Sequence, residues 1–574
     1  MLAKINKLKS WQAALIIVLI GIAVFFTGLT NPFQGDDTSQ IVNNVSVHSI
    51  TNIRQFFTGG TFYVGPGLPL SGGNYRPLMT TVFSLLYTLV GPHTLGYHLL
   101  QLVLYIGCAI LLFLFLKYTF KPLLALVLAL IFLVHPVNSQ VVFAIPSMQD
   151  VLCLFFGLLA LWLLVRFKSV KSLLLVALCL LLCLLSKETG ILFLAMALAY
   201  LFLFNRERLY KFSGIVAVPT VLWLVLKIHA SGLSANPRNA PIDSLSLAGR
   251  LLNDPAIVLF YITKLLFPWK LASGYYWTYP NFTIRHTLLP LLIDLLVVGL
   301  LVGAGFLVRK KVSRSNFITY QFFAIWSCLG ILLVLQISPL DMTVSETWLY
   351  FPLVGVLGMI GIVLIAYQKY IRPGLFISIA AIIIVGFGIR SAVRGTDYKS
   401  AYVLATHDIT ASADDYTAYN DIAAAYIKQN NFSAALPFAE KSVGIYPTTI
   451  NYLDEGISLA GINNYSQAMV ALKRSLNYFN YSVVYETMAQ LTLVYGTPSA
   501  DQQLLVNSVN NFPKDSVLWM YLAILEDRYY TNSNAQKCIT YAAGYGQVPS
   551  FVYDNIMRDK PFTIYFNGKT INIP

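Results

Sequence analysis

The chain has 574 residues, of which 57% are hydrophobic and only 11% are Asp, Glu, Lys or Arg. Soluble chains carry about 25% charged residues. A mean hydropathy of +0.66 therefore excludes a soluble globular protein and predicts an integral membrane protein with several spans. The net charge of +14 does not indicate nucleic-acid binding, because residues 1–388 carry +16 and residues 389–574 carry −2. A basic excess confined to the membrane part is typical of orientation signals.

Eleven apolar runs predict membrane-spanning helices, since a span needs about 20 apolar residues. The first run follows three lysines as a signal peptide would, but no small-residue cleavage site follows, and we interpret it as a retained helix. The runs lie at 11–30, 96–116, 122–135, 150–166, 172–186, 189–205, 212–229, 287–308, 317–337, 348–367 and 373–390.

Two further apolar stretches, 77–90 and 250–268, are predicted to lie on the membrane surface. With this assignment, six short segments on one side of the membrane hold 17 basic residues, and the longer loops on the other side hold nine. The positive-inside rule then places the N-terminus in the cytoplasm. An odd number of spans places the tail on the extracytoplasmic side.

The tail after Tyr398 is polar and has a helical period. The segment Asn431–Ala435 recurs as Asn464–Ala468, 33 positions later, and a period near 34 is typical of tetratricopeptide repeats. Generic antiparallel helix pairs are the alternative; either arrangement is a stacked helical module, more typical of a binding surface than of a catalyst. We therefore expect a membrane domain at 1–395, with long extracytoplasmic loops at 31–77 and 230–286, and a repeat-like domain at 396–574.

Five groups of ionisable residues are predicted on the extracytoplasmic face, beside the apolar runs. Each alone has a structural interpretation: solvated loop acids or a helix cap, a snorkelling arginine, an interfacial histidine, a charge pair at a bend, or the polar start of a span. Their convergence on one face favours a site. Adjacent carboxylates can act as a base with its partner or hold a divalent cation. The groups are Asp36-Asp37, Asn74-Tyr75-Arg76-Pro77, His135 with Asp150, Lys187-Glu188, and Glu346 with Tyr350.

The order of these motifs resembles the GT-C superfamily of membrane glycosyltransferases. Within it, the chain is most similar to the transmembrane and tetratricopeptide-repeat-containing protein O-mannosyltransferases and their prokaryotic relatives. The resemblance implies an all-α polytopic GT-C fold with about 11 transmembrane helices and two interfacial helices, followed by a tetratricopeptide-like α-solenoid. The matching segments are 36–44, 74–78, Gly96-Tyr97-His98, His135-Pro136-Val137, Asp150-Val151-Leu152, 186–190 and 346–352.

The resemblance implies an inverting transfer of mannose or another hexose from a polyprenyl (dolichyl-type) phosphate to Ser or Thr hydroxyls of proteins. Asp36 would deprotonate the acceptor, with Asp37 as its partner. Arg76 and Lys187 would stabilise the leaving phosphate, with Lys187 the better candidate because Glu188 can hold it in place. No cofactor is required, and a divalent cation held by Asp36 and Asp37 stays open. The sugar pocket would be lined by Glu188, His135, Asp150, His98, Glu346 and Tyr350.

By the same resemblance the repeats would present polypeptide acceptors, and a prokaryotic chain of this kind would lie in the plasma membrane. One alternative is the same fold acting on a cell-envelope glycan or lipid. Alternatives of another class are a transporter or flippase, and a membrane-anchored repeat scaffold without catalysis. A transporter would predict charges buried in mid-span or paired half-helices. Mid-span acids are nearly absent here, with Asp294 the main exception.

Overall fold

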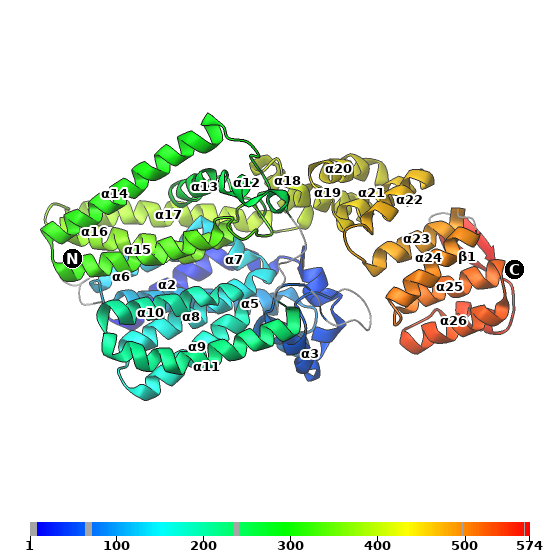
Figure 1. The fold of residues 1–574 in the computed structure, drawn as a ribbon, viewed down its shortest axis with the longest axis horizontal. Helices are drawn as coiled ribbons and strands as arrows, with labels where there is room; N and C mark the ends of the chain where they lie inside the picture. The colour runs from blue at the N-terminus through cyan, green and yellow to red at the C-terminus, as the bar shows by residue number, and fades with distance from the viewer. Residues whose placement is uncertain are drawn as a thin grey trace. The chain divides into compact units, whose positions relative to one another are not determined.

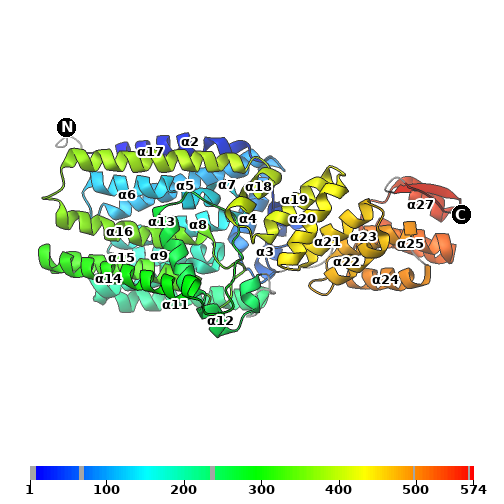
Figure 2. The same ribbon diagram turned by 90° about the horizontal axis from the view of Figure 1, so that it is seen from above.

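The computed structural model describes residues 8–63, 70, 72–232, 240–495, 498–566 and 569–573. The described chain is helical apart from one small hairpin and an isolated bridge. It divides into two compact units (Figures 1 and 2). We call Met1–Phe62 with Ser71–Asp414 the membrane unit, and Tyr63–Leu70 with Asp415–Pro574 the tail unit.

The membrane unit is built from apolar helices joined by turns and by longer loops such as 267–283 (Figure 1). Its helices are α2 Ser10–Phe25, α3 Ile53–Thr58, α4 Pro77–Val90, α5 Thr94–Leu116, α6 Pro122–Val134, α7 Ser139–Phe143, α8 Met148–Arg166, α9 Val170–Ser186, α10 Ile191–Phe204, α11 Arg206–Ser231, α12 Leu247–Leu251, α13 Asp254–Leu266, α14 Leu289–Lys311, α15 Arg314–Val334, α16 Tyr350–Tyr367, α17 Pro373–Asp397 and α18 Ala401–Ala411.

Eight helical segments in the described residues are long and apolar enough to cross a membrane. A ninth arises if α6 and the following turn and helix, Pro136–Phe143, are one span bent by 51° at His135-Pro136. The predicted runs 172–186 and 189–205 form shorter apolar helices, as does 77–90, and 250–268 forms α12 and α13. The prediction of a helical, multi-pass membrane protein is confirmed.

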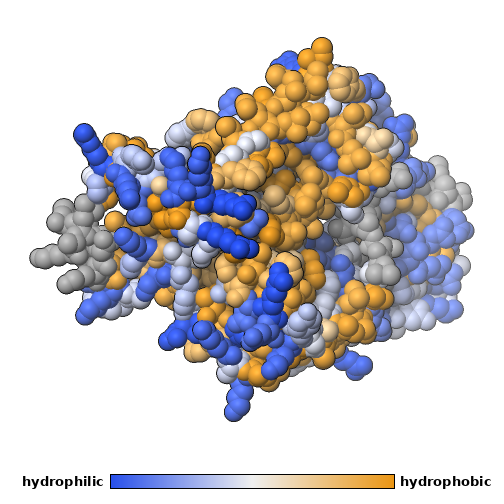
Figure 3. Space-filling view, turned by 60° about the vertical axis from the view of Figure 1, so that its left-hand side comes forward, coloured by the Kyte–Doolittle hydropathy of each residue, from blue (hydrophilic) through white to orange (hydrophobic). Residues whose placement is uncertain are grey.

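The helices differ in how much of their apolar surface faces other helices. The spans containing α8 and α16 bury 67% of their apolar windows, whereas those of α11, α14 and α17 bury 17%. The first two therefore form the centre of the bundle and the other three its periphery, where lipid replaces protein contacts. Figure 3 shows the resulting hydrophobic areas on the outside, interrupted by hydrophilic side chains.

Two turns mark one end of the bundle. Those between α14 and α15 and between α16 and α17 lie at the same end, and α3 and α12 lie at the opposite end (Figures 1 and 2). At this end lie Arg309–Lys311, which end α14, Arg314, which begins α15, and the turn residues Lys369–Arg372. These are among the basic segments that predicted the cytoplasmic side.

The tail unit consists of successive helices, each packed on the next, followed by a hairpin. Asn430 and Asn463, 33 positions apart, both take positive φ values, 57° and 67°, after α19 and α21. The sequence repeat therefore has a backbone counterpart, while the tetratricopeptide assignment stays a prediction. The helices are α19 Tyr416–Lys428, α20 Phe432–Ile445, α21 Thr449–Gly461, α22 Tyr465–Ser475, α23 Ser482–Tyr495, α24 Pro498–Asn511, α25 Ser516–Tyr529, α26 Asn532–Tyr545 and α27 Ser550–Met557.

The hairpin pairs β1 Phe562–Phe566 with β2 Lys569–Ile573 in antiparallel register. No sequence pattern predicted this hairpin. Phe562 and Ile564 are buried, whereas Thr563 and Tyr565 are exposed, which is the alternation of a half-buried strand. The run is too short to stand out in a chain this apolar.

Candidate functional site

The two acidic residues of the first loop have different environments. Gly35 takes a positive φ of 58° just before them and so permits the sharp turn between the first span and the π-helical turn Thr38–Val42. The turn buries Asp37, whose Oδ2 accepts a hydrogen bond of 2.9 Å from the Gln34 amide, and leaves Asp36 exposed. Of the pair, Asp36 is thus the one that a ligand in solution can reach.

Both carboxyls hold protons more tightly than free aspartate. Burial raises the pKa of Asp37 to about 8, with Asp36 adding to the rise and the Gln34 amide opposing it. The pKa of Asp36 is also raised, chiefly by desolvation, although this side chain reaches the surface. Arg76 opposes that rise and Asp341 adds to it. At neutral pH Asp37 is therefore mainly neutral.

Arg76 brings the second predicted motif to the first. Its Nε lies 3.5 Å from Glu188 Oε2, and Glu188 Oε1 accepts a hydrogen bond of 2.7 Å from the amide of Tyr75. The start of α4 is thereby attached to the turn before α10. Because Arg76 also acts electrostatically on Asp36, the three charged residues form one group.

Lys187 has a different partner from the expected one. The resemblance-based prediction paired it with Glu188, but its Nζ lies 2.6 Å from Asp150 Oδ1, and both side chains are at most 10% exposed. Lys187 has an extended backbone (φ −158°, ψ 143°), so neighbouring side chains point to opposite sides. Glu188 therefore turns toward Arg76 and Lys187 toward α8.

Glu346 lies in a third buried group, at the start of the segment that continues as α16. Its Oε1 lies 3.4 Å from Lys264 Nζ and accepts a hydrogen bond of 3.1 Å from the Ala272 amide and another from the Tyr275 hydroxyl. Every hydrogen bond and ion pair of this carboxylate with described residues involves Oε1, which leaves Oε2 without one.

Lys264 and Tyr275 were not predicted as site residues. Burial lowers the pKa of Lys264, with Glu346 opposing the shift, and burial together with Glu346 raises the pKa of Tyr275. Lys264 stands in the apolar run 250–268, where a lone lysine is typical of a membrane-surface anchor. Only its lack of acidic neighbours in the sequence hinted that it needs a distant partner.

The predicted histidines make backbone contacts. His135 Nδ1 accepts a hydrogen bond of 3.4 Å from the amide of Val137, so the ring proton lies on Nε2. Nε2 donates a hydrogen bond of 3.1 Å to the carbonyl of Leu265, the residue next to Lys264. His98 Nε2 donates to the carbonyl of Asn31 at 3.1 Å. His135 thus lies beside the Glu346 group and His98 beside the first loop.

The membrane unit therefore brings the predicted residues into three groups: Asp36 with Arg76 and Glu188, Lys187 with Asp150, and Glu346 with Lys264. Tyr350 is buried and interacts electrostatically with Asp150. Within the described chain, no hydrogen bond or ion pair joins Asp36 or Asp37 to Glu346. The described residues include no group of three or more His, Cys, Asp or Glu side chains placed to hold a metal ion.

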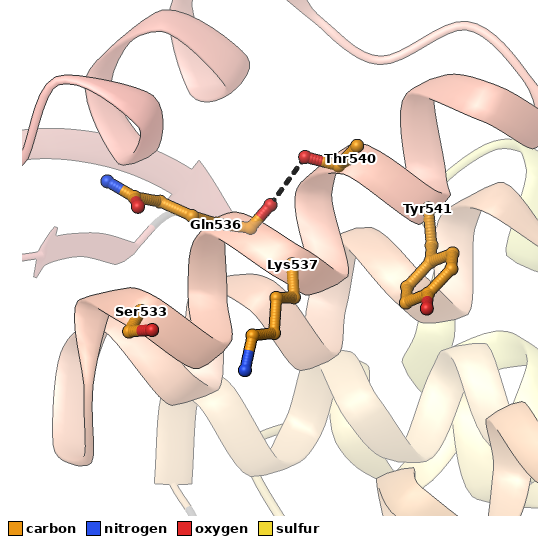
Figure 4. Close-up of a pocket in the computed structure, with 5 residues that line it drawn as sticks. All are labelled: Ser533, Gln536, Lys537, Thr540 and Tyr541. Atoms are coloured by element: carbon orange, nitrogen blue, oxygen red, sulfur yellow. Dashed lines mark hydrogen bonds between the residues drawn. The ribbon is translucent and has the colours of Figure 1, made fainter.

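A pocket in the tail unit has a different character (Figure 4). All its lining residues project from α26, and Thr540 donates a hydrogen bond of 2.7 Å to the backbone carbonyl of Gln536. The lining has no carboxylate, so it does not offer the acid–base chemistry of the membrane unit. The residues are Ser533, Gln536, Lys537, Thr540 and Tyr541.

Known proteins provide an independent comparison. No family model matches the chain. It is 27% identical over 271 residues to the protein O-mannosyl-transferase F38B6.6 of Caenorhabditis elegans, covering 46% of this chain and 39% of the relative. It is 30% identical over 168 residues to human protein O-mannosyl-transferase TMTC4, a match that covers 27% of this chain and 23% of the relative. It is 36% identical over 133 residues to mouse protein O-mannosyl-transferase TMTC1, a match that covers 22% of this chain and 14% of the relative. The chain thus spans less than half the length of these curated relatives.

Two solved structures are similar at a distant level. One is the Archaeoglobus fulgidus oligosaccharyltransferase tethered with an acceptor peptide, with 13% identity, a TM-score of 0.37 and coverage of 76% of this chain and 59% of that one. The other is ArnT from Cupriavidus metallidurans bound to undecaprenyl phosphate, with 14% identity and a TM-score of 0.33. The match covers 84% of this chain and 81% of that one. TM-scores this low do not bear on activity. The sequence matches confirm the predicted resemblance: over part of its length, the chain is similar to the TMTC protein O-mannosyl-transferases.

Proposed function

We propose that the chain is an inverting GT-C glycosyltransferase of the extracytoplasmic membrane face. It would move mannose or another hexose from a polyprenyl-phosphate donor to Ser or Thr hydroxyls of protein acceptors. The observation that carries the proposal is an exposed carboxylate, Asp36, within electrostatic reach of Arg76 in a unit of membrane-capable helices. Similarity to protein O-mannosyl-transferases supports the reaction class.

The proposed step is one in-line displacement. Asp36 accepts the proton of the acceptor hydroxyl while that oxygen forms a bond to the anomeric carbon. The bond between that carbon and the phosphate oxygen breaks, and the electron pair leaves with the lipid phosphate, so the configuration inverts. Attack from the face opposite the phosphate requires the base and the stabilising cation to lie on different sides of the sugar.

Arg76 is the better candidate for the leaving phosphate. Lys187 is held by Asp150 at 2.6 Å, so its charge is largely neutralised, whereas the Arg76 contact to Glu188 is longer, at 3.5 Å. A guanidinium can also present two donors to one phosphate. Lys187 would then hold the pocket wall in place together with Asp150.

Glu346 would bind the sugar through Oε2, since its contacts use Oε1. His135, His98 and Tyr350 would complete the pocket. A divalent cation at Asp36 and Asp37 would supply charge for the departing phosphate, and the mechanism above does not depend on it.

The orientation and the tail complete the proposal. Residues 1–395 would form the catalytic membrane domain, with its N-terminus in the cytoplasm, and residues 396–574 an extracytoplasmic tetratricopeptide-like domain. Helix α18, which falls in the second range, belongs to the membrane unit, which extends to Asp414. The 33-residue recurrence of Asn430 and Asn463 supports a repeat module, which would present polypeptide acceptors to the site. In a prokaryote the enzyme would lie in the plasma membrane.

The test compares the sugars of the host with and without the protein. Deleting the gene, or introducing Asp36→Asn, should remove hexoses from Ser and Thr of secreted and surface proteins, as measured by mass spectrometry. Asp243→Asn, in the other long loop, is the matched control and should leave them unchanged. Intact protein glycosylation with an altered envelope glycan would instead establish the glycan or lipid acceptor.

A further inference from the structure

The loop that contacts Glu346 is anchored at several points. We call residues 269–275, which follow α13, the anchored loop. On its inner side the carbonyl of Lys270 accepts a hydrogen bond from Lys264 Nζ, and the amide of Ala272 donates to Glu346. The Tyr275 hydroxyl also reaches Glu346, and its backbone bridges to Val344. The loop thus supplies two of the three groups around Glu346 Oε1.

The outer side of the loop is held by the end of the last span and the helix after it. Arg390 of α17 donates two hydrogen bonds, of 3.0 and 2.8 Å, to the carbonyl of Trp269. Asp408 of α18 accepts a hydrogen bond of 2.8 Å from the amide of Ser273 at Oδ2. Ala272 lies between these two anchor points.

Asp408 is itself fixed by a buried arginine. Its Oδ1 lies 3.0 Å from an Arg394 guanidinium nitrogen, and both side chains are at most 2% exposed. Arg394 also contacts Asp397, at 3.0 Å. Asp408 therefore uses both oxygens: Oδ1 contacts Arg394 and also His407 Nδ1, at 3.1 Å, and Oδ2 accepts from the loop.

We propose that Asp408 is a positioning residue, which, held by Arg394, fixes the anchored loop so that Ala272 and Tyr275 meet Glu346. The segment after the last span would thereby set the geometry of the sugar pocket without touching substrate. Small errors in the placement of a pocket group slow a reaction disproportionately, because the bound substrate leaves its productive orientation. The effect on transfer rests on the proposed function; the effect on the loop does not.

Asp408→Asn is the decisive variant because it keeps the volume of the side chain. The carboxamide has one accepting oxygen, which the buried Arg394 guanidinium is expected to retain. The NH₂ group then faces the Ser273 amide and cannot accept from it. Asp397→Asn is the matched control, since it removes the other carboxylate contact of Arg394 but none to the anchored loop.

The measurement is hydrogen–deuterium exchange of the full chain in lipid nanodiscs, read at peptides covering residues 270–276, together with transfer activity. Asp408→Asn should raise exchange at this segment by about tenfold, because the protecting contact is lost. It should lower transfer by about tenfold as well. Asp397→Asn should stay within about twofold of the wild type in both.

Unchanged exchange in Asp408→Asn, or an equal rise in Asp397→Asn, would overturn the inference. If Asp408→Asn does not fold, Arg390→Gln replaces it, since it removes the contacts to Trp269 from the other side and should raise exchange at the same peptides. Faster exchange in a protein whose wild type transfers no sugar would support the positioning role and refute the proposed function instead.

Discussion

The membrane unit and the tail unit differ in whether their buried ionisable side chains form ion pairs. Between side chains that the structure describes, every ion pair joins residues of the membrane unit, from Arg76 to Asp408. In the tail unit, burial raises the pKa of Asp454 and Glu486 to about 7, and no described cation lies within ion-pair distance of either side chain. Buried charges are retained at a cost, so their collection in the less polar unit indicates function there. The tail unit is held together by buried apolar side chains such as Leu472 and Ile539.

The largest effect expected from this contrast is on Asp36. Asp36→Asn should lower transfer at least about 100-fold, because the acceptor hydroxyl loses its base. Initial rates with a polyprenyl-phosphate sugar and an acceptor peptide would measure it.

Asp37→Asn serves as the comparison for that variant. It mimics the neutral form that the pKa of about 8 favours at pH 7, and it should therefore retain most of the activity. If both variants keep full rates, catalysis does not depend on this turn.

The Lys264–Glu346 pair tests how much a buried charge without its partner lowers the free energy of unfolding. Glu346→Gln leaves a buried ammonium without its counter-charge and should lower the free energy of unfolding by about 3 kcal/mol. The double variant with Lys264→Met should recover part of that loss, since no unpaired charge remains. Thermal unfolding in detergent would compare the two, and equal losses would show that the pair contributes packing only.

The buried Asp37 predicts a pH dependence of stability. Its pKa in the folded chain, about 8, exceeds the unfolded value of about 3.9, so unfolding releases a proton between these limits. The free energy of unfolding should therefore fall as pH rises through this window, by about 2 kcal/mol between pH 6 and pH 8.

Thermal unfolding of the wild type and of Asp37→Asn across this range provides the measurement. The slope should be smaller in the variant, which cannot ionise there. Parallel curves would mean that Asp37 stays ionised in the folded protein.

The smallest effect concerns packing in the tail. A Cβ on Gly461 would overlap the ring of Phe432 on the neighbouring helix, so Gly461→Ala should cost about 1–2 kcal/mol. Gly444→Ala, which meets nothing within 4 Å, is the control and should be neutral or slightly stabilising. Equal effects in thermal unfolding would argue against close contact between α20 and α21 at Gly461.

Much of this architecture could be predicted from local patterns. Apolar runs predicted the helices of the membrane unit because each run has its own length and hydropathy, and the recurrence at 431 and 464 predicted the helix pairs of the tail. The acids and bases of the membrane unit stood out because they are rare beside apolar helices. Their pairing did not follow from order alone, as Lys187 and Asp150 show.

The missed residues depend on contacts between distant segments. Lys264 lies 82 positions from Glu346, and Ser273 lies 135 positions from Asp408. Nothing local distinguishes an anchoring lysine from a paired one, or a helix-end aspartate from one that holds a loop. Such roles are set by which loops the folded bundle brings together.

Inverting transfer of a sugar from a polyprenyl phosphate is the proposal on which the roles of Asp36 and Arg76 depend. The most direct measurement is reconstitution of the purified chain with a β-linked polyprenyl-phosphate mannose and an acceptor peptide, followed by NMR of the anomeric centre of the product. We expect an α-linked sugar on Ser or Thr from the wild type and none from Asp36→Asn. A β-linked product, or equal transfer by the Asp36→Asn variant, would contradict it.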